Sequence, residues 1–438
     1  MIPQPSIDSK LPNLQTLYDI VHVSLWRVGV ESRGEGVVSA ELYPHERFEI
    51  MEITGIETLV TDHPLMPHSG RNRLMWVRIT TNTGLTGLGE TFPDGFPEAA
   101  FIHGSLARIL LGRNPLDIET LWWDMFSSFE YYGWAGAEIR ALSAVDMALW
   151  DIAGRSAGVP LYRLLGGKSR ELPVYNTCYD REFSMQTQAA DLAELLLKQN
   201  VTMMKLWPFD RFASRDKGQS ITEEELRQAT IPLRDIRERV GDEMRIAIEG
   251  HGYWNLSSAV RIAVAVEPFG ITWLEDLLPL PQSNVEAYRE LARSTSIPLC
   301  LSERLMTRWQ YNPFLDHRSA QIIMLDVAWT GGISEARRIC AMAEAHQLPV
   351  TFHNCGGPVL CSATTHLAAA TQNLLNVETV RPYFDDYLVY SRGCPEIQKG
   401  FLCPTEAPGL GIQLCDEMGL SERVRVQRSG QAVPGLPT

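Results

Sequence analysis

The chain has 438 residues, of which 45% are hydrophobic and 21% charged, and its formal net charge is −14. That length exceeds a single small core and suits a barrel with an accessory domain. The acidic balance and the lack of a basic cluster argue against binding to nucleic acid. No apolar run approaches the length of a membrane span, so we expect no membrane partner.

The eight cysteines contain no C-x-x-C pair. Several of them fall within apolar strand or helix patterns, where a free cysteine behaves as a small hydrophobic residue. The first residues lack the basic start and the apolar core of a secretory signal. Together these features favour a reducing, cytoplasmic setting. Residues 1–48 show no clear pattern, and we treat them as an N-terminal extension without an assigned function.

Residues 49–165 show strand patterns followed by helix patterns. Strand-like runs, separated by turn signals, cover residues 53–60, 74–80 and 85–90. Helix-like spacing then covers residues 98–111, 117–127 and 137–157. Strands first and helices second predict an α+β domain.

Residues 166–390 alternate short apolar runs with helix-period segments. Apolar runs cover residues 172–177 and 203–207, and six more lie between Arg245 and Glu378. The spacing of about 23–28 residues is roughly one βα unit of an eight-stranded barrel, whose strands all end at one mouth. Each of the last six runs ends in one acid or base, and we expect these side chains to converge: Glu249, Glu275, Glu303, Asp326, His353 and Glu378. The period is lost after residue 390, and residues 391–438 are expected to return to the first domain.

Three glutamates, Glu249, Glu275 and Glu303, end successive runs. One strand-end glutamate is more often a surface or helix-cap residue. Three converging carboxylates would repel one another unless a cation lay between them. Hard oxygen ligands suit Mg²⁺, which keeps positions for water or substrate. The sequence therefore predicts a magnesium site at the mouth of the barrel.

Asp326 and His353 end the next two runs. Neighbouring strands lie about 5 Å apart, so the carboxylate could hold the imidazole and raise its basicity. His353 is then a candidate general base. The alternative is a buried pair with a purely structural role.

Three more residues are candidates for the same site. His251 lies just past the strand end on the side of Glu249, where it could act as acid or base opposite His353, bind the metal, or be a loop histidine. Lys205 could stabilise a carboxylate or enolate oxygen, or extend to solvent. Glu378 could share a proton with an enolate as a carboxyl kept neutral in an apolar site, or cap a strand at the surface.

At these residues the chain resembles the enolase superfamily, in its mandelate racemase branch, and most of all the sugar-acid dehydratases of the galactonate dehydratase type. The resemblance covers roughly residues 50–415. Residues 144–154 and 164–168 look like the end of that branch's capping domain, and residues 330–336 look like the start of the helix after strand six. The fold that it implies is α/β, a (β/α)7–8 TIM-type barrel over residues 166–390. An α+β capping domain would be built from residues 49–165 and from the C-terminal segment 391–438.

The resemblance also assigns residues. It implies that Glu249, Glu275 and Glu303 bind magnesium and that Asp326 and His353 form the base dyad. The first ligand of this branch is usually Asp, so the longer arm of Glu249 is a departure. A second departure is Trp207, which replaces the second lysine of the Lys-x-Lys motif in the racemases and leaves only Lys205. His251 matches the acid that helps the leaving hydroxyl depart in galactonate dehydratase-like enzymes.

The implied activity is the magnesium-dependent dehydration of a sugar acid, an aldonate or aldarate, to a 2-keto-3-deoxy acid. His353 would take the α-proton, Glu378 would hydrogen-bond the enediolate, and His251 would protonate the departing β-hydroxyl. The residues expected to bind the substrate are Lys205, Trp207, Arg304 and Glu378. Loops over residues 63–73 and 92–96 are expected to close the mouth and select the substrate.

Two other functions fit the same residues. An epimerase, racemase or cycloisomerase could use His251 and His353 as opposed acid and base on a hydroxy-carboxylate. A non-catalytic protein that binds a metal or a sugar acid could also retain the barrel, because a fold does not fix a function. We further expect a homo-oligomer.

Overall fold

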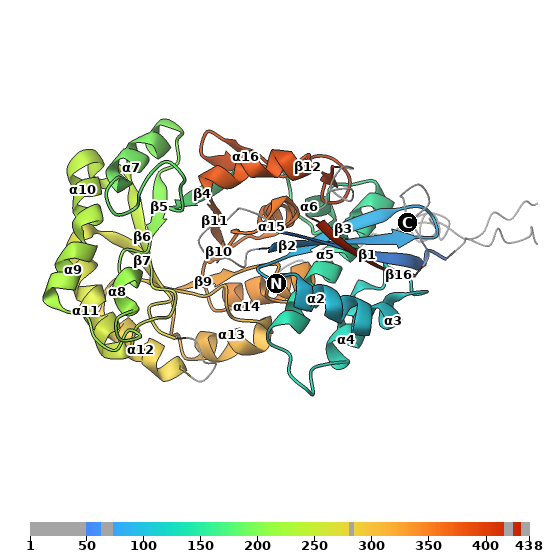
Figure 1. The fold of residues 1–438 in the computed structure, drawn as a ribbon, viewed down its shortest axis with the longest axis horizontal. Helices are drawn as coiled ribbons and strands as arrows, with labels where there is room; N and C mark the ends of the chain where they lie inside the picture. The colour runs from blue at the N-terminus through green and yellow to red at the C-terminus, as the bar shows by residue number, and fades with distance from the viewer. Residues whose placement is uncertain (1–49, 63–72, 280–283, 416–423, 431–438) are drawn as a thin grey trace, which may run out of the picture. The chain divides into compact units, whose positions relative to one another are not determined.

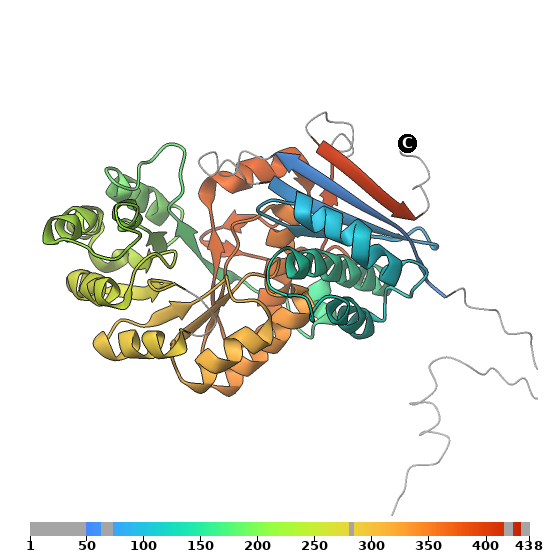
Figure 2. The same ribbon diagram turned by 60° about the horizontal axis from the view of Figure 1, so that its bottom comes forward.

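The computed structural model describes residues 50–62, 73–279, 284–415 and 424–430. Four antiparallel strands form one sheet in the order β16-β1-β2-β3 (Figures 1 and 2). They are β1 (Ile53–Asp62), β2 (Arg73–Thr81), β3 (Thr86–Thr91) and β16 (Val424–Gly430). Strand β16 comes after the barrel in the sequence and pairs with β1 from Gly55–Gly430 to Thr61–Val424. The sheet therefore unites segments from both sides of the barrel, and we call it, with its helices, the capping domain.

The helices of the capping domain are α2 (Phe96–Phe101), α3 (Ala107–Leu110), α4 (Ile118–Ser127) and α5 (Ala137–Ala157). A continuous helix was expected over residues 98–111, but a π-helical turn over Ile102–Leu106 separates α2 from α3. Helix α5 lies directly on β3 because two strand residues there are glycines. A Cβ atom added to Gly89 would lie 1.8 Å from the carbonyl oxygen of Ala144. The absence of a side chain at this position sets how closely β3 and α5 can pack.

Eight parallel strands form the barrel, and the pairing of β11 with β4 closes it (Figure 1). The strands are β4 (Leu172–Thr177), β5 (Met203–Leu206), β6 (Arg245–Glu249), β7 (Ile271–Glu275), β8 (Leu299–Leu301), β9 (Ile322–Leu325), β10 (Val350–Phe352) and β11 (Leu374–Thr379). All eight strand patterns seen in the sequence are present. The prediction of a TIM-type barrel with an α+β capping domain is confirmed.

The longer helices of the barrel alternate with these strands. They are α7 (Ala189–Lys198), α9 (Glu223–Ala229), α10 (Ile231–Val240), α11 (Leu256–Val266), α12 (Val285–Ser294), α13 (Thr307–Asp316), α14 (Gly332–Ala345), α15 (Pro358–Ala370) and α16 (Arg381–Tyr390). Short helices occupy Leu161–Leu164 (α6) and Asp210–Ala213 (α8). Within the described residues, we find no helix with the length and apolar character that crossing a bilayer requires.

The interior of the barrel is filled by side chains that point inward from several strands. They form one buried cluster of Tyr175, Met203, Ala247, Trp273, Cys300, Ile322 and Met324. A second and larger cluster lies between the strands and the surrounding helices. Because strands that are buried on both faces need apolar residues at nearly every position, the sequence runs look continuous rather than alternating.

The segment after α16 contacts the barrel before it reaches the capping sheet. Strands β13 (Ile397–Gln398) and β14 (Phe401–Leu402) form a hairpin, and β14 pairs with the first residues of β4. Strands β12 (Ser391–Arg392) and β15 (Gln413–Leu414) pair with each other.

The capping domain is bonded to the barrel where α5 meets the start of α14. The Asp146 carboxylate accepts the Ser334 N–H at 2.9 Å and the Ser334 hydroxyl at 2.6 Å, and Trp150 Nε1 donates to the same hydroxyl at 2.9 Å. Gly332, with φ of +79°, leaves room for this contact, since a Cβ there would lie 2.3 Å from Asp146 Oδ2. The sequence segments 144–154 and 330–336 are therefore the two sides of one interface.

Candidate active site

The strand ends surround a cavity of about 140 Å³ at the mouth of the barrel. Seven residues predicted from the sequence line it: Lys205, Trp207, Glu249, His251, Glu303, His353 and Glu378. Five residues that the sequence did not single out complete the wall: Thr177, Tyr179, Cys355, Val380 and Tyr383. The structure thus brings together residues that are far apart in the sequence, such as Thr177 and Glu378, which are in contact although 201 positions separate them.

Lys205 is the centre of charge in this site. The residue is only 3% exposed, and its ammonium lies 2.5 Å from Glu275 Oε1, 3.1 Å from Glu378 Oε1 and 3.4 Å from Glu249 Oε2. Burial opposes the charge, but Glu275 and Glu378 more than offset burial and raise the pKa of Lys205 well above its usual value. The side chain therefore points inward as a charged group, and of the two orientations expected it does not extend to solvent.

The three glutamates at the ends of β6, β7 and β8 are all buried. Burial raises the pKa of Glu249 to about 7, and burial together with the charge of Glu249 raises the pKa of Glu275 well above its usual range. Glu303 differs, because the charges of His353, Lys205 and Arg304 offset its burial and lower its pKa. Its Oε2 atom has no hydrogen-bond partner.

These donors fit a hard divalent cation. One buried carboxylate oxygen has no partner, and two of the acids have raised pKa values. Both features are expected of an acidic cluster whose negative charge is incompletely balanced. Lys205 supplies part of that balance. The ligand atoms of these three glutamates are not, however, the set whose atoms lie nearest to one another. Among the described residues, the one set of three metal-binding side chains whose ligand atoms lie within 4.8 Å of one another is His353, Cys355 and Glu378.

The Asp326–His353 pair has the geometry expected for a base and its orienting acid. Asp326 Oδ2 lies 2.6 Å from His353 Nδ1, and Asp326 Oδ1 accepts the backbone N–H of Ala328 at 2.7 Å. Burial works against a charged imidazole, but nearby groups, with Cys355 and Glu378 the largest, raise the pKa of His353 well above its usual value. His353 is therefore a strong base whose Nε2 is the nitrogen left for the cavity.

Two states were considered for Glu378, a carboxyl kept neutral in an apolar site and a strand cap at the surface. The side chain is buried and surrounded by donors. Its oxygens accept the Thr177 hydroxyl, the Lys205 ammonium and the backbone N–H of Asn354 at 3.3 Å. Burial would raise the pKa of Glu378, yet Lys205 and His353 lower it to about 2. Glu378 is an ionised acceptor that holds Lys205 and faces His353.

His251 has a partner that sequence reasoning missed. Asp210, on the short helix α8, places Oδ2 at 2.5 Å from His251 Nδ1. Burial raises the pKa of Asp210, and the hydrogen bond with His251 opposes that rise. The imidazole packs beside Trp207, with ring centroids 5.9 Å apart. Asp210 follows the second barrel strand without any repeating pattern, so the sequence carries no signal that joins it to His251.

Arg304 does not line the cavity. Its Nε donates to Asp276 Oδ2 at 3.1 Å, and its Nη1 donates to the carbonyl oxygen of His251 at 3.2 Å. Gly252, with φ of +68°, gives space for the guanidinium. The contacts of Arg304 are therefore with the loop that carries His251, and its expected role in substrate binding stays a prediction.

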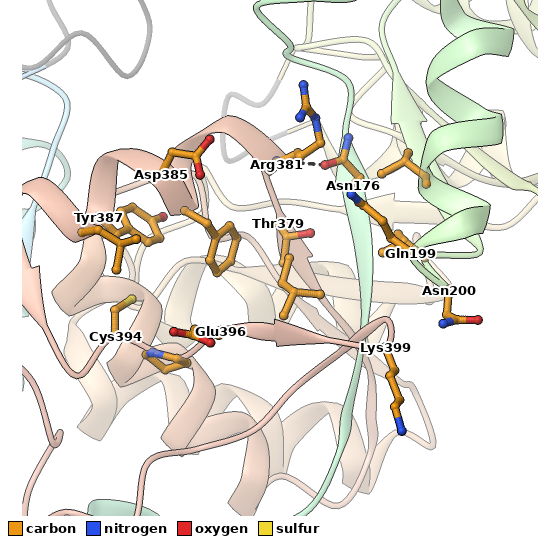
Figure 3. Close-up of a pocket in the computed structure, with 16 residues that line it drawn as sticks. Asn176, Gln199, Asn200, Thr379, Arg381, Asp385, Tyr387, Cys394, Glu396 and Lys399 are labelled. Carbon is orange, nitrogen blue, oxygen red and sulfur yellow. Dashed lines mark hydrogen bonds between the residues drawn. The ribbon is translucent and has the colours of Figure 1, made fainter.

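A larger hollow of about 500 Å³ lies outside the barrel between the end of α7, helix α16 and residues 394–399 (Figure 3). Arg381 is the main cationic group there, but its backbone N–H donates to Asn176 and its guanidinium is paired with Asp180 and Glu182, both at 2.8 Å. No histidine lines this hollow. The two histidines that are paired with aspartates, His251 and His353, line the cavity at the mouth of the barrel instead.

Comparisons with known proteins agree with this geometry. Residues 55–166 match the model of the mandelate racemase/muconate lactonizing enzyme N-terminal domain, and residues 188–418 match that of the enolase C-terminal domain-like family. The chain belongs to the mandelate racemase/muconate lactonizing enzyme family of the enolase superfamily. The resemblance inferred from the sequence is confirmed, and so is the prediction of an enzyme.

The chain is similar to several named dehydratases and to proteins of known structure. D-gluconate dehydratase of Thermoproteus tenax is 31% identical over 77% of this chain and 67% of its own length. D-xylonate dehydratase of Haloferax volcanii is 29% identical over 83% of this chain and 87% of its own length. The crystal structure of an enolase of the mandelate racemase subgroup from Agrobacterium tumefaciens has 37% identity and a TM-score of 0.79, covering 86% of this chain and 99% of that one.

In this enolase-family chain the end of β3 braces the Asp326–His353 pair from the capping domain. Glu90, which is fully buried, accepts the backbone N–H of Gly357 and, at 3.0 Å, that of Val359 at the start of α15. The Thr91 hydroxyl donates at 3.2 Å to the carbonyl oxygen of Ala328, in the loop after Asp326. The loops that follow both members of the dyad are thus bonded to one strand of the capping domain.

Phe92 adds a packing contact to this brace. Its ring stacks on the His353 imidazole with centroids 6.3 Å apart, and its carbonyl oxygen accepts Trp329 Nε1 at 3.0 Å. The loop expected to close the mouth therefore touches the base at Phe92. The other expected loop, residues 63–73, lies outside the described residues except for Arg73.

Replacing Glu90 with Gln tests the brace. Three N–H donors, from Gly357, Val359 and Trp76, now share two carboxylate oxygens, and the amide would offer one oxygen. A buried donor left without an acceptor costs about 1–3 kcal/mol. Because a small displacement of a catalytic group can lower a rate by up to about a hundredfold, we expect kcat to fall by about ten- to a hundredfold with a smaller change in KM.

Glu57→Gln is the matched control for this prediction. Glu57 is also a buried carboxylate of the capping sheet, but it pairs with Arg78 and Arg428, both at 2.8 Å. Steady-state kinetics should be measured below the unfolding temperature of each variant. If the kcat of Glu90→Gln falls only in proportion to the fraction of unfolded protein, the contacts of Glu90 have no role in catalysis.

Proposed function

We propose that this enzyme dehydrates a sugar acid to a 2-keto-3-deoxy acid with the help of Mg²⁺. One observation carries the proposal. Two histidines line the same small cavity, and each is held at Nδ1 by its own aspartate: His353 by the buried Asp326 and His251 by the half-buried Asp210. Relatives named D-gluconate, D-xylonate and D-galactonate dehydratase support this class of reaction.

The strand order supports opposed acid and base positions. His251 follows β6 and His353 follows β10, and these strands are four apart in a closed ring of eight. The two imidazoles therefore approach the cavity from opposite sides of the barrel. Since Nδ1 of each ring is already bonded, Nε2 is the atom left to exchange a proton with a substrate.

Glu249, Glu275 and Glu303 would hold the Mg²⁺. When bound, the ion would supply positive charge that acidifies the α-carbon of a substrate carboxylate. The buried ammonium of Lys205 would pair with that carboxylate, so that anionic substrates are accepted despite the acidic walls. Glu378 keeps Lys205 in place as an ionised acceptor and does not itself supply a proton.

The proton transfers are then assigned to the two histidines. Neutral His353 removes the α-proton at Nε2, and the electron pair of the broken C–H bond forms an enediolate. Asp326 and Glu378 stabilise the imidazolium that results. Protonated His251 donates to the β-hydroxyl, the C–O bond breaks with loss of water, and the enol becomes the 2-keto acid. General acid–base catalysis of this kind contributes about 10²–10⁴-fold for each group.

An epimerase or racemase is the second candidate, because two histidines on opposite sides can remove a proton from one face and return it to the other. Product analysis separates the two reactions, since only dehydration forms a 2-keto acid. The cytoplasmic setting and the homo-oligomer stay predictions.

A substrate screen tests the proposed function directly. Aldonates and aldarates of both configurations, including D-gluconate, D-galactonate and D-xylonate, should be incubated with the enzyme and assayed for 2-keto acid. We expect product from at least one acid sugar, loss of activity with a chelator, and its return with Mg²⁺. Conversion of an acid sugar to an epimer without any 2-keto acid would replace dehydration with the second candidate.

His353→Asn tests the base. Asn keeps a polar side chain of similar reach but accepts no proton, so exchange of the substrate α-proton with D₂O should fall by at least about a hundredfold. His346→Asn is the control, because His346 ends α14 away from the cavity and contacts Met342 and Asp316. Exchange is followed by NMR. Exchange at the rate of the unchanged enzyme would exclude His353 as the base.

His251→Asn tests the acid by separating two steps. Because His251 is assigned only to the departure of the hydroxyl, 2-keto acid formation should fall by about a hundredfold or more while α-proton exchange continues. The ratio of exchange to elimination is the quantity to measure. If both rates fall by the same factor, His251 does not act as the acid of the second step.

A further inference from the structure

Cys355 lies in the site but has no part in the proposed reaction. It is buried, comes two residues after His353 and lines the cavity with it. One ligand atom each of His353, Cys355 and Glu378 lies within 4.8 Å of the other two. An imidazole nitrogen, a sulfur and a carboxylate oxygen in one place form a different donor set from that of the three glutamates.

Two of these three side chains are held by a second layer of contacts. Asp326 accepts from His353 Nδ1, so the ring directs Nε2 toward Glu378 Oε2, 3.8 Å away. Metal-bound histidines in proteins have this carboxylate partner on the other ring nitrogen. Glu378 is fixed at Oε1 by Thr177 and Lys205 and at Oε2 by the backbone N–H of Asn354. A cation would therefore meet ligands that are already oriented.

We propose that His353, Cys355 and Glu378 form a second metal site, selective for a soft divalent cation such as Zn²⁺, whose occupation blocks the base. Thiolate and imidazole ligands favour Zn²⁺ and its heavier congener Cd²⁺, whereas oxygen ligands alone favour Mg²⁺. Three protein ligands leave a fourth position of a tetrahedral ion for water from the cavity.

The blocking effect follows from the shared nitrogen. A cation at this site displaces the proton from Cys355 Sγ, which becomes a thiolate, and occupies the Nε2 lone pair of His353. That lone pair is the one that the proposed reaction needs for the α-proton. Zn²⁺ is therefore an inhibitor even when Mg²⁺ is saturating. Binding itself is independent of the proposed function, and only the inhibition rests on it.

The decisive experiment titrates the full-length enzyme with Cd²⁺ in saturating Mg²⁺ and records the ultraviolet charge-transfer absorption of a Cd²⁺–thiolate bond. Zn²⁺ inhibition is measured in parallel. Cys355→Ser removes the sulfur, and Cys403→Ser is the control because Cys403 is exposed and does not line the cavity. We expect one equivalent of absorption in the unchanged enzyme and in Cys403→Ser, its loss in Cys355→Ser, and at least a tenfold rise in the Zn²⁺ concentration for half inhibition in Cys355→Ser.

A second measurement on the unchanged enzyme guards against a poorly folded variant. Zn²⁺ should slow alkylation of Cys355 by at least tenfold, as read by mass spectrometry of the peptide that contains it, while alkylation of Cys403 is unaffected. Charge-transfer absorption that persists in Cys355→Ser, or equal alkylation of Cys355 with and without Zn²⁺, would overturn the site. The absorption and the alkylation measurements do not require catalytic activity. They therefore remain valid tests of the site even if the substrate screen finds no activity.

Discussion

The burial of one ammonium among several carboxylates is the constraint on which the site depends. Lys205 contacts Glu249, Glu275 and Glu378, and all four groups are almost completely removed from water. Taking charges out of water costs several kcal/mol for each ion unless partners are close. The acids outnumber the cations at this mouth, so protons, a metal ion or both must complete the balance. Burial is the main cause that raises the pKa of Glu249 to about 7, and the charges of Glu303 and Asp276 add to it.

The same imbalance bears on how an acidic protein would accept the anionic substrate that we propose. A chain with a net charge of −14 repels carboxylates at long range. A cation held by Glu249, Glu275 and Glu303 would reverse the local sign, and Lys205 would add a second positive charge beside it. The carboxylates repel one another when no cation is bound. They would therefore help to bind an anionic substrate only once a cation balances their negative charge.

The capping domain contributes to the chemistry through the backbone as well as through its loops. Strand β3 bonds the loop after Asp326 by Thr91 and the loop after His353 by Glu90. Its position is in turn fixed by Gly87 and Gly89, which let α5 lie against the strand. A helix–sheet contact in one domain thus helps to set the position of His353, the proposed proton acceptor, in the other.

These links also show which residues a sequence can reveal. The strand-end acids and His353 were found because a buried strand is a recognisable run and its last residue faces the mouth by topology alone. Asp210 was missed because it lies on α8, outside the strand pattern. It reaches His251 only because the backbone of His251 itself is held at φ of +45°. Glu90 was missed because its partners are backbone N–H groups, which leave no mark in the sequence. The ionised state of Glu378 depends on the charges of Lys205 and His353, and the sequence does not show how close these two groups lie to its carboxylate.

The closed ring places hard and soft ligands on different parts of one mouth. Strands β6, β7 and β8 end in carboxylates, whereas β10 is followed by an imidazole and a thiol. Lys205 on β5 and Glu378 on β11 connect the two groups, because one carboxylate oxygen binds the ammonium while the other faces His353. A hard cation and a soft cation would thus bind at the ends of different strands, and only the soft one would occupy the His353 imidazole. In the proposed reaction, the order of strands around the barrel, and not the number of acidic residues, would decide which ion assists the base and which one blocks it.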